Sequence, residues 1–119
     1  MSKEITRIGV GERMSEASVF NGVVRLAGMV PENTEGQGIE AQTSDVLAQI
    51  DQHLAACGSD KSRLLRVQIY LADLADFAGM NSVWAKWVVA GQTPPRATVQ
   101  ALLAKPEWRI EVVVDAAQA

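Results

Sequence analysis

The hydrophobic period of the chain changes near Gly58, and this change constrains the fold more than any other feature. From Ile39 to Cys57, apolar side chains recur every three or four residues, the spacing of one face of an amphipathic helix. Gly58 readily takes the left-handed conformation that closes a helix. From Leu65 to Leu71, apolar and polar residues alternate, as in a strand with one face in the core. The sequence therefore predicts a helix followed directly by a half-buried strand.

The dipeptide Asn21-Gly22 predicts a β-hairpin in the first quarter of the chain. Both residues readily adopt the positive φ angles of a type I′ turn, and apolar segments flank them at residues 18–20 and 23–30. Pro31 then ends the second strand, because proline has no amide hydrogen to donate to a sheet. Residues 5–10 alternate weakly and predict a short strand before the hairpin.

The second half of the chain predicts one more helix and two more strands. After Asp73, the segment to about Val89 has apolar residues on one side of a helix. These apolar residues are Phe77, Met80, Trp84, Trp87 and Val88. Strands are predicted at residues 96–102 and 108–115, each after a turn that contains proline. The element order β-ββ-α-β-α-β-β predicts an α+β sandwich, a mostly antiparallel sheet with two helices on one face.

Composition limits the chain to one domain and a small set of functions. Its 119 residues are 48% hydrophobic, which suits a single domain over residues 1–119. A net charge of −3 leaves no basic surface for nucleic acid. With one cysteine, Cys57, and one histidine, His53, we expect no internal disulfide and no metal site. No apolar run could span a membrane and residues 1–4 begin no leader peptide, so we expect a cytoplasmic protein.

The segment from Thr93 to Ala101 places an arginine at the start of a strand, directly after a rigid turn. Pro94 and Pro95 fix their own φ angles, so Arg96 begins its strand in a preorganised position. The planar guanidinium matches a carboxylate through two parallel hydrogen bonds. Arg96 is therefore a candidate anchor for a small acid. The alternative is an ordinary arginine in a surface ion pair.

Strand periodicity suggests which residues share a face with Arg96. If Ile110, Val112 and Val114 face the helices, then Glu111 faces the opposite side. On this interpretation the opposite face also carries Arg66, Gln68, Tyr70, Arg96, Thr98, Gln100, Arg109, Val113 and Asp115. Such a face of mixed polarity is either solvated or packed against another subunit.

Arg96 and Glu111 form the candidate catalytic pair. If strands 96–102 and 108–115 pair as a hairpin, the two side chains approach each other. They would then supply an anion anchor and a carboxylate for acid–base chemistry or for positioning water. A cross-strand salt bridge is the alternative, and the spacing does not distinguish the two.

Several other polar or reactive residues have simpler structural explanations. His53 borders the apolar side of its helix and has no serine or cysteine at a catalytic spacing. Cys57 lies on that apolar side, which favours a buried and inert thiol. Asp45 and Asp51 fit a solvated helix face, and Asn81 fits either a loop-capping role or a place in a binding site.

Four segments together are similar to a known family. They are residues 25–31 (Arg-Leu-Ala-Gly-Met-Val-Pro), 76–84 (Asp-Phe-Ala-Gly-Met-Asn-Ser-Val-Trp), 94–100 (Pro-Pro-Arg-Ala-Thr-Val-Gln) and 110–112 (Ile-Glu-Val). The Pro-x-Arg-x-x-Val element before a terminal Ile-Glu strand is the most specific of them. Over nearly its whole length the chain resembles the RidA (YjgF-type) reactive intermediate deaminase family, and within it the small YoaB-like branch.

This resemblance implies a chorismate-mutase-like fold, a single domain of the endoribonuclease L-PSP type, assembled as a homotrimer with ligand sites between subunits. Arg96 would hold the carboxylate of a 2-imino or 2-enamino acid. Glu111 would position the water that hydrolyses this acid to a 2-oxo acid and ammonia. Gly28 and Asn81 match positions that line or support the cleft. The chemistry needs neither metal nor organic cofactor, because an imine carbon is already electrophilic.

Three residues depart from the pattern of the family's deaminating branch. Met14 takes the place of an aromatic hydroxyl, Thr98 that of a thiol, and Gln100 that of an acidic residue. Met14 cannot donate a hydrogen bond to a substrate. The same trimer therefore has an alternative function, as a non-catalytic module that binds or senses a small carboxylate such as a 2-oxo acid. The candidate ligand-binding residues are Arg96, Gly28, Asn81, Thr98 and Met14.

Overall fold

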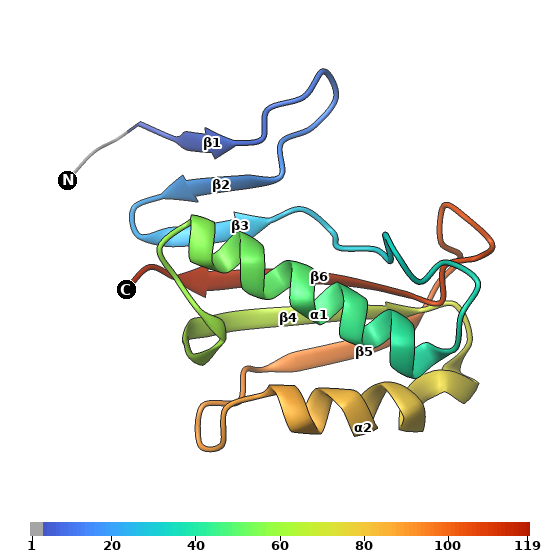
Figure 1. The fold of residues 1–119 in the computed structure, drawn as a ribbon. Coiled ribbons are helices and arrows are strands. Elements are labelled where there is room, and N and C mark those ends of the chain that lie inside the picture. Colours follow the sequence, from blue (N-terminus) through green and yellow to red (C-terminus); the bar gives the residue numbers. More distant parts are fainter. Residues whose placement is uncertain (1–3) are drawn as a thin grey trace.

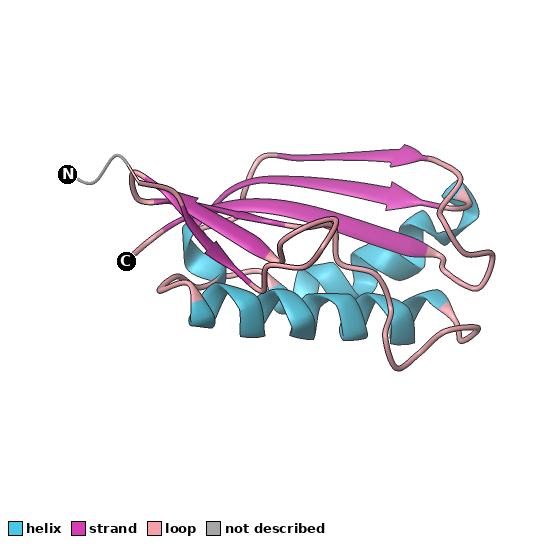
Figure 2. Cartoon of the chain, turned by 90° about the horizontal axis from the view of Figure 1, so that it is seen from above, coloured by secondary structure: helices cyan, strands magenta, loops and turns pink. Residues whose placement is uncertain are grey.

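The computed structural model describes residues 4–119, in which two helices lie on one face of a single six-stranded sheet (Figure 1 and Figure 2). The strands are β1 (Thr6–Ile8), β2 (Ala17–Phe20), β3 (Val23–Leu26), β4 (Leu64–Leu71), β5 (Arg96–Gln100) and β6 (Ile110–Ala117). The helices are α1 (Ile39–Ala56) and α2 (Phe77–Trp87), with short 3-10 helices η1 (Lys61–Arg63) and η2 (Leu74–Asp76). The α+β class and the predicted element order are confirmed.

The last strand of the chain takes a central place in the sheet. The strand order is β1-β2-β3-β6-β4-β5, so β6 pairs antiparallel with both β3 and β4. β5 pairs with β4 in parallel, because the crossover through α2 returns the chain in the same direction. The hairpin of β5 with β6 considered from the sequence is therefore wrong, since β4 lies between them.

The predicted hairpin of β2 and β3 is present. Asn21 and Gly22 have φ angles of 55° and 79°, as a type I′ turn requires. β3 ends earlier than predicted, at Leu26, and the chain then leaves the sheet edge. It returns at Met29, which forms an isolated bridge with Val112 of β6. This bridge brings the segment after β3 alongside the start of β6.

The hydrophobic core lies between the helices and the sheet. Alternate residues of the two central strands are buried, and so is the apolar stripe of α1. The largest contributions come from Val67, Ile69, Leu71, Ile110, Val112, Val114, Val46, Leu47, Ile50 and Leu54. Cys57 is buried at the end of α1, as predicted, and burial raises the pKa of its thiol. Gly58 follows with φ of 75° and closes the helix.

The opposite face of the sheet, called the open face below, has neither helix on it (Figure 2). Residues that alternate with the core point to this face, among them Gln68, Tyr70, Glu111, Val113 and Asp115. Asp115 forms an ion pair with Arg25 of β3 at 3.3 Å and lies opposite Arg66 of β4. The mixed polarity predicted for this face is therefore confirmed.

α2 starts at Phe77, later than the sequence suggested, because a 3-10 helix comes first. Asp73 accepts a hydrogen bond from the Ala75 amide at 2.9 Å and so caps η2 rather than α2. Met80 and Trp84 are buried, as predicted, whereas Phe77 is 38% exposed at the start of the helix. This exposed ring lies beside Arg96 (see below).

Residues 4–119 contain neither a membrane-spanning helix nor a cluster of metal ligands. No helix within them is long and apolar enough to cross a membrane. They also contain no group of three or more His, Cys, Asp or Glu side chains that could hold a metal ion. The prediction that residues 1–4 begin no leader peptide falls mostly on residues 1–3, which lie outside the described part of the chain. The cytoplasmic location stays a prediction.

Candidate functional site

Arg96 lies on the helix side of the sheet, not on the open face. It pairs in parallel register with Val67, a fully buried core residue, and parallel partners point to the same side. Thr98 and Gln100 follow at alternate positions of β5 and also pair with buried residues of β4. The interpretation that placed these three residues with Glu111 is wrong, because periodicity alone does not fix how β5 is registered against β4.

Side chains of α2 hold the guanidinium of Arg96. Its Nη1 donates a hydrogen bond to Asn81 Oδ1 at 2.8 Å and lies 4.0 Å from the sulfur of Met80. The Cζ atom is 5.2 Å from the centre of the Trp84 ring and 5.9 Å from that of the Phe77 ring, both cation–π distances. Burial lowers the pKa of Arg96, yet a guanidinium stays charged at any physiological pH.

No carboxylate within residues 4–119 forms an ion pair with Arg96. The surface and cross-strand ion pairs considered from the sequence are therefore both wrong. Nη1 donates to Asn81 Oδ1 and, more weakly, to the Met80 sulfur, whereas Nε and Nη2 have no hydrogen-bond partner within the same residues. A half-buried cation without a counter-charge favours the binding of an anion, because the ion pair offsets the hydration that the cation lost on burial.

Thr98 and Gln100 lie on the same face of the sheet as Arg96 but differ in their side-chain hydrogen bonds. Thr98 Oγ1 is hidden from solvent and has no hydrogen-bond partner among the described residues. Gln100 Oε1 accepts from the amide of Leu74 at 2.9 Å, which ties the end of β5 to η2. Gln100 is thus engaged in a structural bond, whereas the hydroxyl of Thr98 is unused.

Glu111 lies on the open face in direct contact with Gly28. Glu111 pairs with Tyr70 of β4, and its half-buried side chain folds back over the segment after β3. A Cβ atom added to Gly28 would overlap a carboxylate oxygen of Glu111 and lie 3.0 Å from its Cδ. Only glycine leaves room for this approach. Two candidate residues that the resemblance brought together are therefore neighbours.

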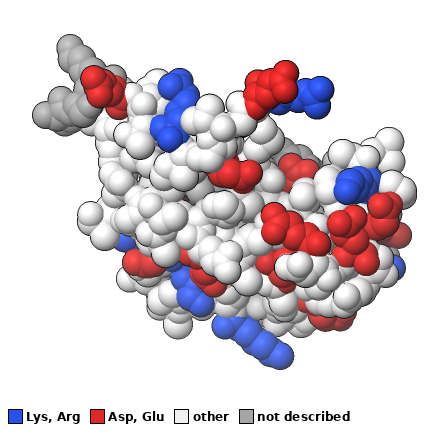
Figure 3. Space-filling view, turned by 45° about the horizontal axis from the view of Figure 1, so that its top comes forward, with Lys and Arg blue, Asp and Glu red and all other residues white. Residues whose placement is uncertain are grey.

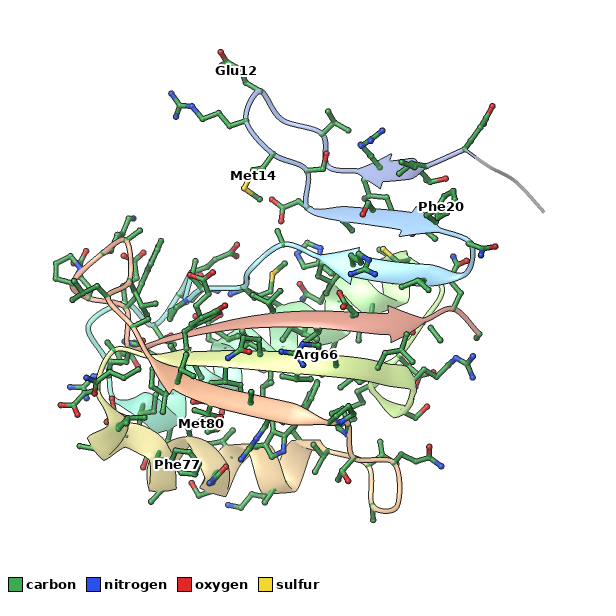
Figure 4. All side chains as sticks on the ribbon, turned by 180° about the vertical axis from the view of Figure 1, so that it is seen from behind. Glu12, Met14, Phe20, Arg66, Phe77 and Met80 are labelled. Carbon is green, nitrogen blue, oxygen red and sulfur yellow. The ribbon has the colours of Figure 1, made fainter. Side chains whose placement is uncertain are left out.

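Met14 lies far from the Arg96 group. It belongs to the loop that joins β1 to β2, and its side chain is 55% exposed. Figure 4 places Met14 at the β1–β2 side of the molecule and Phe77 and Met80 at the α2 side. Within one chain, the candidate residues thus form an Arg96 group with Asn81 and Thr98 and a Glu111 group with Gly28, while Met14 lies on the β1–β2 loop.

One chain does not bring Arg96 and Glu111 to a common ligand. Their side chains leave opposite faces of the sheet, and β4 separates their strands. The predicted pairing through a β5–β6 hairpin is therefore corrected by the register. Each group on its own still has a recognisable chemistry: an uncompensated guanidinium in one, and an accessible carboxylate in the other.

The sequence reasoning missed a row of polar residues on α1, called the α1 polar stripe below. Gln42, Asp45 and Gln49 follow one another at helical spacing and all face the loop that follows β3. Gln42 and Gln49 are buried. Amides set at i and i+7 beside an apolar stripe are the signal that could have identified it.

Asp45 is not part of a solvated face, contrary to the prediction. Its Oδ2 accepts from the amides of Glu32 and Asn33, at 3.0 and 2.9 Å, and from Thr34 Oγ1 at 2.8 Å. Burial alone would raise the pKa of this carboxyl group, but these bonds and one from Gln49 together lower it. Asp51, in contrast, is exposed and accepts from the Trp87 indole at 3.0 Å.

The structure is an α+β sandwich with an arginine, lacking a carboxylate partner within residues 4–119, at the start of its parallel edge strand. The family model described as Endoribonuclease L-PSP matches residues 4–118, and the chain belongs to this family, the YjgF proteins.

The similar proteins agree on fold and family. A YjgF family member from Neisseria meningitidis has a solved structure with 52% identity and a TM-score of 0.95, covering 98% of this chain and 97% of that one. RutC family protein YoaB of Escherichia coli (strain K12) is 45% identical over 95% of this chain and 97% of its own. Reactive Intermediate Deaminase A, chloroplastic, from Arabidopsis thaliana is 35% identical over 82% of this chain and 54% of its own length.

Proposed function

We propose that the protein hydrolyses 2-imino or 2-enamino acids to 2-oxo acids and ammonia, at a site between subunits of a homotrimer. The observation that carries the proposal is Arg96, a partly desolvated guanidinium without a carboxylate partner in residues 4–119. The family relationship adds support, because one relative bears the name of a reactive intermediate deaminase.

Arg96 binds the substrate carboxylate in this scheme. Asn81 holds Nη1, and the rings of Trp84 and Phe77 flank the guanidinium, so its plane is oriented before the substrate arrives. A planar fork fixed in this way forms two parallel hydrogen bonds with a carboxylate at a small entropic cost. The anchor contributes position and, by its charge, draws electrons away from the imine carbon.

Glu111 positions water and accepts its proton. The water oxygen forms a bond with C2 of the imine, while the proton it loses passes through the Glu111 carboxylate to the nitrogen, which gives a carbinolamine. The C2 hydroxyl then loses its own proton, which reaches the amine nitrogen by way of the same carboxylate. The C2–N bond breaks, ammonia leaves, and a C2 carbonyl remains. An acid–base group contributes roughly 10²- to 10⁴-fold to such a step.

The site requires two chains. Because Arg96 and Glu111 lie on opposite faces of one sheet, both reach one ligand only where the open face of one copy meets the α2 side of another. Such a heterologous contact closes into a ring, and a homotrimer is the ring we propose. Phe20 and Val99 on the open face are 47% and 45% exposed in the single chain, so the open face has apolar area to bury.

The first test generates 2-iminopropionate in the cuvette with an amino acid oxidase and follows its decay. We expect the wild-type protein to accelerate the decay, and Arg96→Ala and Glu111→Gln each to lose at least roughly 100-fold in kcat/KM. Lys86→Ala, which removes an exposed cation from the groove between α1 and α2, is the control and should be unchanged. Wild-type decay no faster than buffer would exclude the enzyme.

The second test mixes the two inactive variants. If each site takes Arg96 from one chain and Glu111 from another, co-refolded Arg96→Ala and Glu111→Gln proteins regain about one quarter of wild-type activity by random assembly. Light scattering should give three times the mass of one chain. No recovery in the mixed assembly would show that the two residues do not act across subunits.

A second function, ligand binding without turnover, has its own support. Met14 offers no hydrogen bond from its side chain, and Gln100 is engaged with the Leu74 amide. Calorimetry with pyruvate distinguishes the two functions. Binding that disappears in Arg96→Ala, with no imine hydrolysis by the wild type, would favour a sensing or binding module.

A further inference from the structure

Gln42 is a fully buried amide whose hydrogen bonds join two separate loops. Its Nε2 donates to the carbonyl oxygens of Gln37 at 3.0 Å and Glu107 at 2.9 Å. Its Oε1 accepts from the amide of Arg109 at 2.7 Å. Gln37 belongs to the loop after β3, whereas Glu107 and Arg109 lead into β6. One side chain of α1 therefore fixes both segments.

The rest of the α1 polar stripe reaches only the first of these loops. Asp45 bonds residues 32–34, and Gln49 donates to the carbonyl of Val30 at 2.8 Å. The two loops also touch each other, through the amide of Gly36 and the carbonyl of Glu107 at 3.2 Å. Figure 1 shows them meeting at one end of the sheet, beside the start of α1.

The residue type at this position is informative because a primary amide offers the two donors and the acceptor that the three hydrogen bonds use. A carboxylate would face the two carbonyl oxygens with a negative charge. Acidic side chains already gather on the surface at this end of the molecule, where Glu35 pairs with Lys105 at 3.7 Å (Figure 3). A neutral buried group holds the loops without adding to that charge.

Gln42 is connected to the Glu111 group by a short path. The backbone amide of Arg109 donates to Gln42, and Arg109 precedes Glu111 by two residues. Immediately beyond, Met29 and Val112 exchange hydrogen bonds of 2.8 and 3.0 Å, and Gly28 contacts the Glu111 carboxylate. Any shift of residues 107–109 along α1 would move that carboxylate over Gly28, where there is no spare room.

We propose that Gln42 is a positioning residue, which sets the start of β6 and thereby places the Glu111 carboxylate against Gly28. The inference rests on the function proposed for Glu111. It assigns no contact with substrate to Gln42. The hydrogen bonds of Gln42 to residues 37, 107 and 109 are called the Gln42 clamp below. Arg96 is unaffected by this clamp, because the side chains that contact Arg96 come from α2 and none comes from either loop.

The test uses Gln42→Met, which keeps the length of the side chain and removes its hydrogen bonds. We expect kcat to fall roughly 10- to 100-fold, because a misplacement of about 1 Å is enough for this, while KM changes less than about twofold. Thr43→Val is the matched control: the next residue on α1 is also buried, and its hydroxyl has no partner among the described residues. Its kinetics should equal those of the wild type.

A double-mutant cycle separates positioning from a general loss of structure. If Gln42 acts through Glu111, Gln42→Met should cause little further loss of kcat in a Glu111→Gln background. Fully additive losses, an unchanged kcat, or a KM that rises as steeply as kcat falls would each overturn the inference. Failure of the proposed function would appear separately, as a wild type without turnover.

Amide hydrogen exchange tests the clamp without any substrate, so it can also be measured on a variant that has lost activity. In Gln42→Met the amides of Arg109 and Val112 should exchange at least roughly tenfold faster, while those of β5 keep their wild-type rates. If Gln42→Met does not fold, Gln42→Asn, which keeps an uncharged amide but is one methylene shorter and so cannot hold both loops, takes its place. Unchanged exchange at Arg109 and Val112 would overturn the inference whatever the activity assay gives.

Discussion

The two charged groups of the candidate site are held in different ways. Arg96 is fixed by side chains, through the amide of Asn81 and the rings of Trp84 and Phe77. The Glu111 carboxylate instead lies against the backbone at Gly28, where an added Cβ atom would overlap it. Substitutions near Arg96 should therefore change affinity by degrees. A side chain added at Gly28 should displace the Glu111 carboxylate, because the two would occupy the same space.

The largest expected effect comes from Gly28→Ala. The added Cβ overlaps the Glu111 carboxylate, so either the side chain or the strand must shift. We expect kcat for imine hydrolysis to fall roughly 100-fold, with pyruvate binding at Arg96 retained. Kinetics and calorimetry on the same preparation check this. Gly38→Ala is the control, because a Cβ there meets nothing nearer than 3.7 Å. Normal turnover in Gly28→Ala would contradict the close contact.

Asn81→Ala should have the next largest effect, on affinity rather than on rate. It removes the acceptor that orients Arg96, and a hydrogen bond to a charged group contributes about 1.5–3 kcal/mol. We expect KM and the pyruvate dissociation constant to rise roughly tenfold or more, with kcat nearly unchanged. Ser82→Ala, on the next residue of α2, removes a bond to the Gly79 carbonyl and serves as control. Equal losses in both variants would contradict a specific role for Asn81.

Asp45→Asn tests the support behind the Glu111 group through stability and its pH dependence. The folded-state pKa of Asp45 is lowered, so its contribution is present above the unfolded pKa of about 3.9 and is lost as pH falls through the folded value. For this partly exposed carboxylate we expect about 1–2 kcal/mol less stability at pH 7 in the variant.

Urea unfolding at pH 7 and below pH 4 measures both parts of that prediction. The difference between wild type and Asp45→Asn should shrink steadily on acidification, because a protonated Asp45 no longer holds the loop as an anion. Asp51→Asn, on the exposed part of the same helix, should show a much smaller difference at pH 7. A difference independent of pH would assign the effect to packing instead.

The smallest effect is expected for Gln100→Glu. A carboxylate can accept the hydrogen bond from the Leu74 amide as the present amide does, so the tie between β5 and η2 survives. We expect kcat/KM to change less than about threefold, within the range of a surface charge change. A gain of tenfold or more would show that position 100 belongs to the site after all, and would weaken the distinction between its two halves.

Local pattern predicted most of the fold, whereas it did not predict the register of β5. The helical spacing of residues 39–57, the turn at Asn21-Gly22 and the alternation around Val67 each depend on neighbouring residues alone. The face of Arg96 depends on a pairing across the α2 crossover, which no local pattern encodes. The hairpin with β6 was wrong for that reason.

The candidate site was predicted in part. Family resemblance named Gly28 and Asn81 as residues that line or support a cleft, without saying what they touch; the structure adds the contact of Gly28 with Glu111 and the hydrogen bond of Asn81 with Arg96. Gln42 was missed because the amides at positions 42 and 49, which border the apolar stripe of α1, were interpreted as part of the solvated side of the helix. Roles for Thr98 and Met14 in ligand binding stay predictions.

The position of β6 has a consequence for how the protein is made. β6 lies between β3 and β4, yet it leaves the ribosome after both of them. Until residues 110–117 emerge, the hairpins and helices before them have no strand to join them and leave their apolar faces uncovered. Non-local pairing of this kind slows folding and exposes intermediates to aggregation. The nascent chain therefore depends on its final strand for solubility as well as for Glu111.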